Sequence, residues 1–105
     1  MFDDNSFGRP IRLAYLEARL FLDGEFYSRK LMQFGYSRQS ASSDIKTYLT
    51  MHPGVMNYCP RSKRFILDRR HKPKLLRQEQ LAHYARYVET IFSLAYKPLA
   101  KSVDV

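Results

Sequence analysis

The sequence is poor in the residues that form disulfides, metal clusters and membrane spans. Cys59 is the only cysteine, so an intrachain disulfide is excluded and there is no thiolate cluster to hold zinc. The three histidines, His52, His71 and His83, are scattered along the chain. No apolar run approaches the roughly 18 residues of a membrane span, and residues 1–8 lack a basic segment followed by an apolar one. These absences predict a cytoplasmic protein without a metal, a cofactor or a membrane partner.

Signs of catalysis are equally scarce. The ten carboxylates are dispersed, no glycine-rich phosphate loop is present, and no histidine lies at helical spacing from a nucleophile. We therefore do not expect an enzyme. The apolar fraction of 45% and the aromatic fraction of 14% are ample for a hydrophobic core. A length of 105 residues fits one domain.

The positive charge is unevenly distributed, which says more than the net charge of +8. Residues 1–27 contain three basic and five acidic residues, and residues 78–105 contain three of each. Residues 28–77 contain twelve basic residues and two acidic ones. A solvated basic face, as on ribosomal and membrane-surface proteins, is one interpretation. So localised an excess is also the pattern expected of a surface that contacts nucleic-acid phosphates.

The middle of this basic region has the pattern of a helix-turn-helix. Ser28 is a candidate N-cap for a short first helix, and Gly35 permits the positive φ of a tight turn. Ser37 is the candidate cap of a second helix, which we expect to end near Met51 because Pro53 disfavours helical geometry just before it. Apolar residues at helical spacing predict one buried face of this second helix: Ala41, Ile45, Tyr48 and Leu49. Its other face is polar and suits a DNA major groove: Arg38, Gln39, Ser42, Ser43 and Lys46.

The flanking segments complete a winged helix. Pro10 and Gly24 are placed to begin and end a first helix that packs across the helix-turn-helix. Segment 26–27 forms either a short strand or a hydrophobic staple at the entry to the next helix. Two strand-prone runs, 55–58 and 65–67, flank a basic turn and predict a β-hairpin. As a wing, the hairpin would bring three basic side chains to phosphates or a minor groove: Arg61, Lys63 and Arg64.

A last helix is expected from about Lys74 to Tyr96, ended by Pro98. It carries an apolar stripe that is longer than a small three-helix core needs: Leu81, Tyr84, Val88, Ile91, Phe92 and Ala95. The stripe can pack on its own domain or on the same helix of a second subunit. We favour the second arrangement, which makes these residues a dimerisation surface, because winged helices commonly read two half-sites as dimers.

In this order the segments resemble a known family. The motifs are R-L-F at 19–21, F-G-Y-S at 34–37, Q-S-A-S-S-D at 39–44 and H-P-G-V at 52–55. They are similar to the N-terminal winged helix of WYL-domain transcriptional regulators, in particular the repressors of bacterial phage-defence islands. The resemblance covers roughly residues 9–97, and the ligand-sensing WYL domain is absent from these 105 residues.

The resemblance implies double-stranded DNA binding and transcriptional repression by a homodimer. The match carries six DNA contacts onto this chain: Ser37, Arg38, Gln39, Ser40, Ser43 and Lys46. Arg38 suits a guanine edge and Gln39 an adenine edge, whereas the serines and Lys46 would hold phosphates. Ser42, on the same face, is a further candidate. Two alternatives remain, a protein-interaction module that binds an acidic partner and an architectural DNA-binding protein with little sequence preference.

The predicted fold is therefore mostly α with a small β-hairpin, a winged helix-turn-helix followed by a C-terminal dimerisation helix. We expect a flexible N-terminus at 1–9, the DNA-binding domain at 10–68, a linker with the last helix at 69–97, and a flexible tail at 98–105. We expect a bacterial or phage protein that is located in the cytoplasm, in association with the nucleoid.

Overall fold

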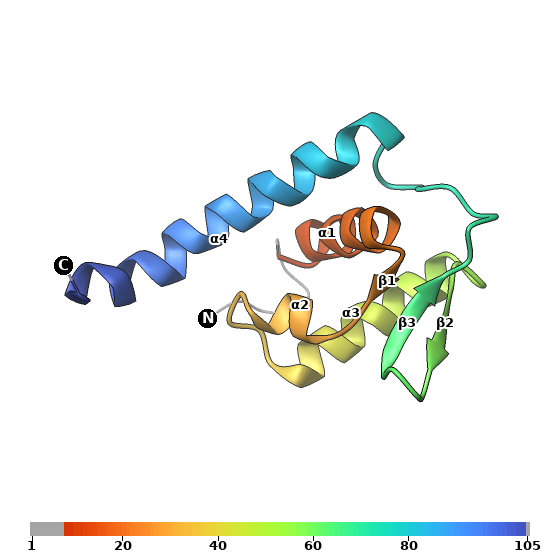
Figure 1. Cartoon of the computed structure of the whole chain (residues 1–105), viewed down its shortest axis with the longest axis horizontal. Coiled ribbons are helices and arrows are strands. Elements are labelled where there is room, and N and C mark those ends of the chain that lie inside the picture. Colours follow the sequence, from red (N-terminus) through yellow and green to blue (C-terminus); the bar gives the residue numbers. More distant parts are fainter. Residues whose placement is uncertain (1–7, 105) are drawn as a thin grey trace.

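The computed structural model describes the backbone of residues 8–104 and the side chains of residues 8–92. The elements follow one another as α1 (Gly8–Asp23), β1 (Glu25–Phe26), α2 (Arg29–Met32), α3 (Arg38–Met51), β2 (Met56–Cys59), β3 (Arg64–Leu67), a 3-10 helix (Gln78–Gln80) and α4 (Leu81–Asp104). Helices α1, α2 and α3 and the sheet form the body, and α4 crosses α1 and continues beyond it (Figure 1). The prediction of a mostly helical winged helix is confirmed.

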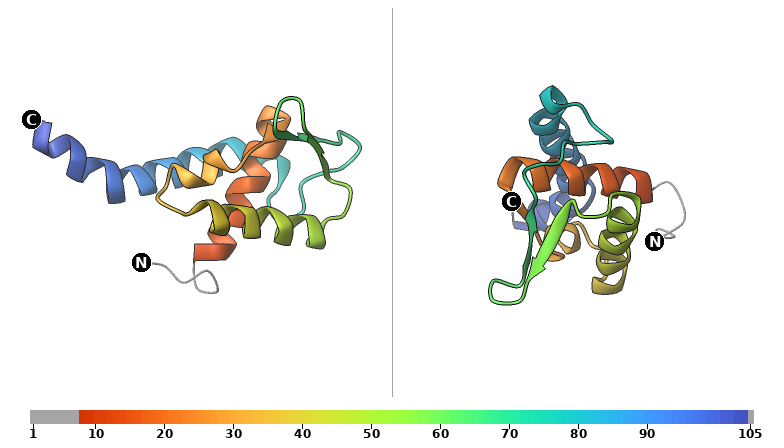
Figure 2. Two further views of the ribbon diagram at one scale, coloured as in Figure 1. Left: turned by 90° about the horizontal axis from the view of Figure 1, so that it is seen from below. Right: turned by 90° about the vertical axis from the view of Figure 1, so that its right-hand side faces the viewer.

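Helix α1 lies at the centre of the fold, with α4 on one side of it and α3 on the other (Figures 1 and 2). Its leucines Leu13, Leu16 and Leu20 recur at helical spacing and turn one apolar side into the core. The predicted buried face of α3 is confirmed by the burial of its apolar residues: Ala41, Ile45, Tyr48 and, in part, Leu49. Burying each large apolar side chain stabilises the fold by about 1.5–3 kcal/mol, so α1 and α3 are held as one unit.

The turn between α2 and α3 follows the sequence prediction, but the start of α2 does not. Gly35 has a φ of +95°, and the Ser37 hydroxyl accepts from the backbone amide of Ser40 at 3.0 Å. The prediction that Ser28 caps α2 with its side chain is wrong. Ser28 has helical backbone angles and makes no side-chain cap, whereas a capping side chain reaches the helix amides from an extended backbone.

Strand β3 is the middle strand of a three-stranded antiparallel sheet of order β1-β3-β2. The β2–β3 hairpin confirms the predicted wing, with Met56 opposite Leu67 at its base. Of the two alternatives for segment 26–27, the strand is found, because β1 pairs Glu25 with Ile66 and Phe26 with Phe65. Strand β1 therefore attaches the wing to the end of α1.

Helix α4 differs from the prediction at both ends. The predicted start at Lys74 is wrong, because residues 74–76 bend around Glu17, whose carboxylate accepts from their three backbone amides. The helix begins only at Leu81. The predicted end at Pro98 is also wrong, since α4 runs through it to Asp104. A proline keeps a helical φ and removes one backbone hydrogen bond, which this helix accommodates.

The apolar stripe of α4 packs mostly on its own domain, so the favoured assignment to a second subunit is wrong for most of it. Leu81 and Val88 are buried in the core. The Tyr84 hydroxyl donates to the Ile11 carbonyl at 3.1 Å, and the ring of Phe92 stacks on Phe34 with centroids 4.8 Å apart. Most of the stripe therefore contributes to the hydrophobic core of its own domain. Ile91 is 45% exposed, and the side chain of Ala95 lies outside those described.

Candidate nucleic-acid interface

The outward side of α3 carries most of the predicted contacts. Arg38, Gln39, Ser42 and Lys46 are exposed along it. Ser37 is exposed at its N-cap, and Ser40 is half-buried in its first turn. The exposed side chains follow from helical geometry, because the residues between them face α1 and the core.

Ser43 is the exception, because it is turned toward α1. Its hydroxyl accepts from Nη2 of Arg9 at 2.9 Å, and Nη1 of the same arginine donates to Thr47 at 2.9 Å. Arg9 thus lies along the side of α3, and Ser43 serves the packing of the two helices. The sequence pattern placed Ser43 outside because nothing local indicated the arginine, 34 residues earlier.

A buried ion pair between α1 and α3 fixes the position of the recognition helix. Asp44 and Arg12 are both buried, and Arg12 donates to the two Asp44 oxygens at 2.5 and 3.1 Å. Burial alone would lower the pKa of Arg12, but the hydrogen bonds to Asp44 and Tyr36 and the charge attraction of these two groups together outweigh it and raise that pKa. The guanidinium also lies over the ring of Tyr36, 4.4 Å from its centroid, in the turn before α3. The rotation and depth of α3 are therefore set by a charge pair as well as by apolar packing.

A groove of about 980 Å³ runs between α3, the start of α2 and the wing. It unites five of the predicted contacts: Arg38, Ser42, Lys46, Lys63 and Arg64. Ser37, Gln39, Ser40, Ser43 and Arg61 do not line it. The groove adds residues that sequence reasoning missed, chiefly Arg29, Lys30 and Gln33 of α2 and the turn after it, and Tyr27 and Tyr58 near the sheet. The adjacent basic pair Arg29–Lys30 at the start of the helix-turn-helix was the signal that could have indicated them.

The wing has a four-residue turn with two exposed cations. Lys63 closes it with a φ of +61°, and its amide donates to the Cys59 carbonyl at 2.7 Å. Arg61 and Lys63 are exposed at the tip. Behind the turn, Tyr58 pairs with Phe65 across the strands, with ring centroids 5.0 Å apart, so the tip extends from a packed base.

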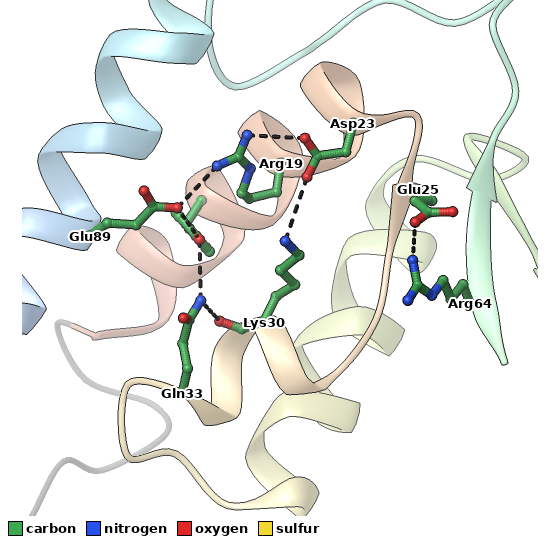
Figure 3. Close-up of polar contacts among 8 residues, drawn as sticks. Arg19, Asp23, Glu25, Lys30, Gln33, Arg64 and Glu89 are labelled. Atoms are coloured by element: carbon green, nitrogen blue, oxygen red, sulfur yellow. Dashed lines mark hydrogen bonds and ion pairs between the residues drawn. The ribbon is translucent and has the colours of Figure 1, made fainter. Parts of the chain in front are cut away.

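Arg64, the third predicted wing contact, is already engaged within the domain. It forms an ion pair with Glu25 of β1 (Figure 3), and its guanidinium lies over the ring of Tyr27, 4.4 Å from the centroid. Lys30 has a looser partner, since its ammonium is 3.8 Å from the carboxylate of Asp23. Two of the groove cations, Arg64 and Lys30, therefore have acidic neighbours.

A polar network joins α4 to the helix-turn-helix through α1 (Figure 3). Glu89 of α4 accepts from the Tyr15 hydroxyl at 2.6 Å and from Arg19 at 3.1 Å. Burial, and then the hydrogen bond to Glu89, raises the pKa of Tyr15. Arg19 also donates to Asp23 at 3.0 Å, and Gln33 donates to the Tyr15 hydroxyl at 3.4 Å. The position of α4 is thus tied to groove residues of the α2 region.

Glu17 forms a second, buried junction. Its carboxylate accepts from the Tyr48 hydroxyl of α3 at 2.6 Å and from the amides of Lys74, Leu75 and Leu76 at 2.7–2.9 Å. Burial, followed by this hydrogen bond, raises the pKa of Tyr48. One carboxylate therefore joins α1, the recognition helix and the segment that leads to α4.

Among the residues that the structure describes, no three His, Cys, Asp or Glu side chains gather into a group that could hold a metal ion. Within the same part of the chain, no helix is both long and apolar enough to cross a bilayer.

The seated helix α3, the basic wing and the groove between them define a winged helix-turn-helix of the nucleic-acid-binding kind. The sequence profile of the BrxR transcriptional regulator winged helix-turn-helix domain matches residues 8–90. The chain therefore belongs to this family. No curated protein sequence matches it.

Proposed function

We propose that this chain is a sequence-specific regulator that represses transcription by binding a palindromic operator as a homodimer. The observation that carries the proposal is the charge of the groove. Six of its lining residues are cations, and none of the lining residues that the structure describes is acidic. A duplex whose major groove receives α3 would lie along this groove, with the wing beside it.

Within this proposal, helix and wing have different tasks. Arg38 and Gln39 stand exposed at the N-terminal end of α3, the end that contacts base edges in helix-turn-helix proteins. They are our candidates for sequence reading, because Arg pairs with guanine and Gln with adenine. Ser37, Ser40, Ser42 and Lys46, together with Arg61 and Lys63 of the wing, would hold phosphates and fix the register, which carries no sequence information.

Substitutions in the helix and in the wing should separate these tasks. Arg38→Ala or Gln39→Ala should cost about 1–3 kcal/mol on the cognate duplex and relax the preference at one base position. Arg61→Gln or Lys63→Asn should instead weaken all duplexes alike and reduce the salt slope by about one unit. Asparagine is the chosen replacement for Lys63, because it tolerates the positive φ found there. Binding to a selected operator and to its single-base variants measures both effects.

Equal behaviour of the helix and wing variants would contradict sequence reading and leave an architectural DNA-binding protein. The operator itself can be sought by footprinting the DNA upstream of the protein's own gene, since small repressors often regulate themselves.

The homodimer needs a surface other than the buried part of the stripe. Tyr87 and Ile91 are 59% and 45% exposed on α4, and α4 continues beyond the body of the domain (Figure 1). A second copy of α4 against this side would cover both apolar side chains. It would also pair two recognition helices, as half-sites about 34 Å apart on a palindrome require.

A further inference from the structure

The cations of the groove fall into two groups. Arg64 and Lys30 have carboxylate partners, Glu25 and Asp23. Within residues 8–92 the remaining four form no ion pair with an acidic side chain: Arg29, Arg38, Lys46 and Lys63. Of the paired cations, Arg64 lies on β3 and Lys30 on α2, whereas the unpaired ones lie on α2, on α3 and at the wing tip. The sequence pattern gave no reason to treat Arg64 differently from Lys63, its neighbour.

The Glu25–Arg64 pair is built into the sheet. Glu25 lies opposite Ile66 in the pairing of β1 with β3, so Arg64, two residues earlier on β3, is its diagonal neighbour on the same face. The pair is half-exposed, with the two side chains 41% and 33% accessible for Arg64 and Glu25. The Tyr27 ring supports the guanidinium from another side. Arg64 is therefore held by an acid and an aromatic ring at the edge of the groove.

This placement determines what Arg64 can do for an incoming phosphate. To bind a DNA phosphate, the Arg64 guanidinium must either leave Glu25 or donate to the phosphate while it stays paired with the Glu25 carboxylate. The second option places two negative groups well within the Debye length of about 10 Å at 0.1 M salt, where screening is incomplete. Exposed ion pairs are individually weak, so breaking the Glu25–Arg64 pair changes the DNA-binding constant by only about two- to fivefold. If the pair stays intact, the loss of the contact between Arg64 and a phosphate lowers the affinity further.

We propose that Glu25 withholds Arg64 from DNA phosphates and thereby weakens the sequence-independent part of DNA binding by this domain. The inference rests on the proposed function, because it presupposes that the groove receives a duplex. Phosphate contacts are made equally to every sequence, so restraining one of them lowers affinity for random DNA. Glu25 thus acts as a positioning residue for Arg64 and limits non-specific binding, the competitor that any operator must overcome.

The test measures binding to a random duplex, so no operator is needed. Glu25→Gln should raise affinity about three- to tenfold at about 50 mM salt and steepen the salt dependence by about 0.9 in the log–log slope, one additional phosphate contact. Arg64→Gln should lower affinity by no more than about fivefold, because it leaves the Glu25 carboxylate unpaired but removes no phosphate contact. The double variant should bind within twofold of the wild type, so that the gain from Glu25→Gln is lost without Arg64, which shows that Glu25 acts through Arg64.

A matched control corrects for the change in net charge. Glu79→Gln removes the same charge from an exposed residue of the 3-10 helix, which is not among the groove residues, and it should leave affinity within twofold. Thermal unfolding followed by circular dichroism checks that all variants fold. Affinity that is unchanged or lower in Glu25→Gln would overturn the inference, as would a tenfold loss in Arg64→Gln. A wild-type domain that binds no duplex at low salt would instead contradict the proposed function.

Discussion

Two carboxylates among residues 8–92 are fully buried, and each accepts hydrogen bonds from partners that are distant in the sequence. Asp44 receives Arg12 from 32 residues away, and Glu17 receives the amides of residues 74–76. Both hold the recognition helix, Asp44 from within it and Glu17 through the Tyr48 hydroxyl. A buried carboxylate is tolerated when its oxygens accept hydrogen bonds, with or without a cation as the donor. These two residues therefore fix the arrangement of α1, α3 and the segment before α4.

Removing one partner of the buried pair should destabilise the domain severely. Asp44→Ala leaves the Arg12 guanidinium buried without its carboxylate, which costs about 3–5 kcal/mol, a large part of the stability of a small domain. Urea unfolding measures the loss. Replacing both partners with apolar residues, as in Arg12→Met with Asp44→Leu, should recover part of the stability, although Arg9 also loses its ion pair with Asp44. A double variant as unstable as the single one would contradict this account of the pair.

At the scale of elements, the wing is the part whose contact with DNA can be followed directly. Cys59, the only cysteine, lies at the end of β2 beside the turn. Hydrogen bonds from the side chain and the backbone of Ser62 lower the pKa of its thiol. A lower pKa means more thiolate at neutral pH and faster alkylation.

We therefore predict that Cys59 is alkylated faster than a free thiol of ordinary pKa and that Ser62→Ala slows the reaction. Duplex DNA at low salt should protect Cys59, because the proposed complex places the wing against the duplex. Mass spectrometry of iodoacetamide-treated protein, with and without DNA, measures both rates. Alkylation that continues unslowed on saturating duplex would place the wing away from DNA.

The elements differ in how far the sequence predicts them. Helix α3 was predictable because its signals are local: the cap at Ser37, the turn at Gly35 and the stop before Pro53. The hairpin was predictable from two strand-prone runs that flank a basic turn. The start of α4 was not, because it depends on Glu17, far away in the chain. An apolar stripe indicates that a face is buried but not what covers it, so α1 could not be distinguished from a second subunit. For the site, the exposed face of α3 was predicted, and the partners that turn Ser43 and Arg64 away were not.

At the scale of the whole molecule, α4 belongs to the folded unit. Its buried residues Leu81, Ala85 and Val88 share the core with α1, and Glu89 adds hydrogen bonds to Tyr15 and Arg19. We therefore propose that the DNA-binding unit includes α4 through at least residue 92, instead of ending at residue 68 as first expected.

Charged substitutions on α4 should distinguish its two sides. Val88→Asp should unfold the domain, because it places an unpaired carboxylate in the core at a site only 4% exposed. Ile91→Asp should leave the fold intact, because that side chain faces solvent in the single chain. If the outer side of α4 forms the proposed homodimer, Ile91→Asp should convert a dimer into a monomer of 12.5 kDa. Sedimentation of the wild type as a monomer at micromolar concentration would contradict the dimer.

The measurement that tests the central claim most directly is the affinity for duplex DNA as a function of salt. Five exposed cations are available on α2, α3 and the wing: Arg29, Arg38, Lys46, Arg61 and Lys63. Each phosphate they neutralise contributes about 0.9 to the slope. Fluorescence anisotropy should therefore give a log–log slope of roughly −4 to −5 per bound protomer, a loss of about two to three orders of magnitude between about 50 and about 200 mM salt. No binding at low salt, or a slope near zero, would contradict DNA binding through this groove.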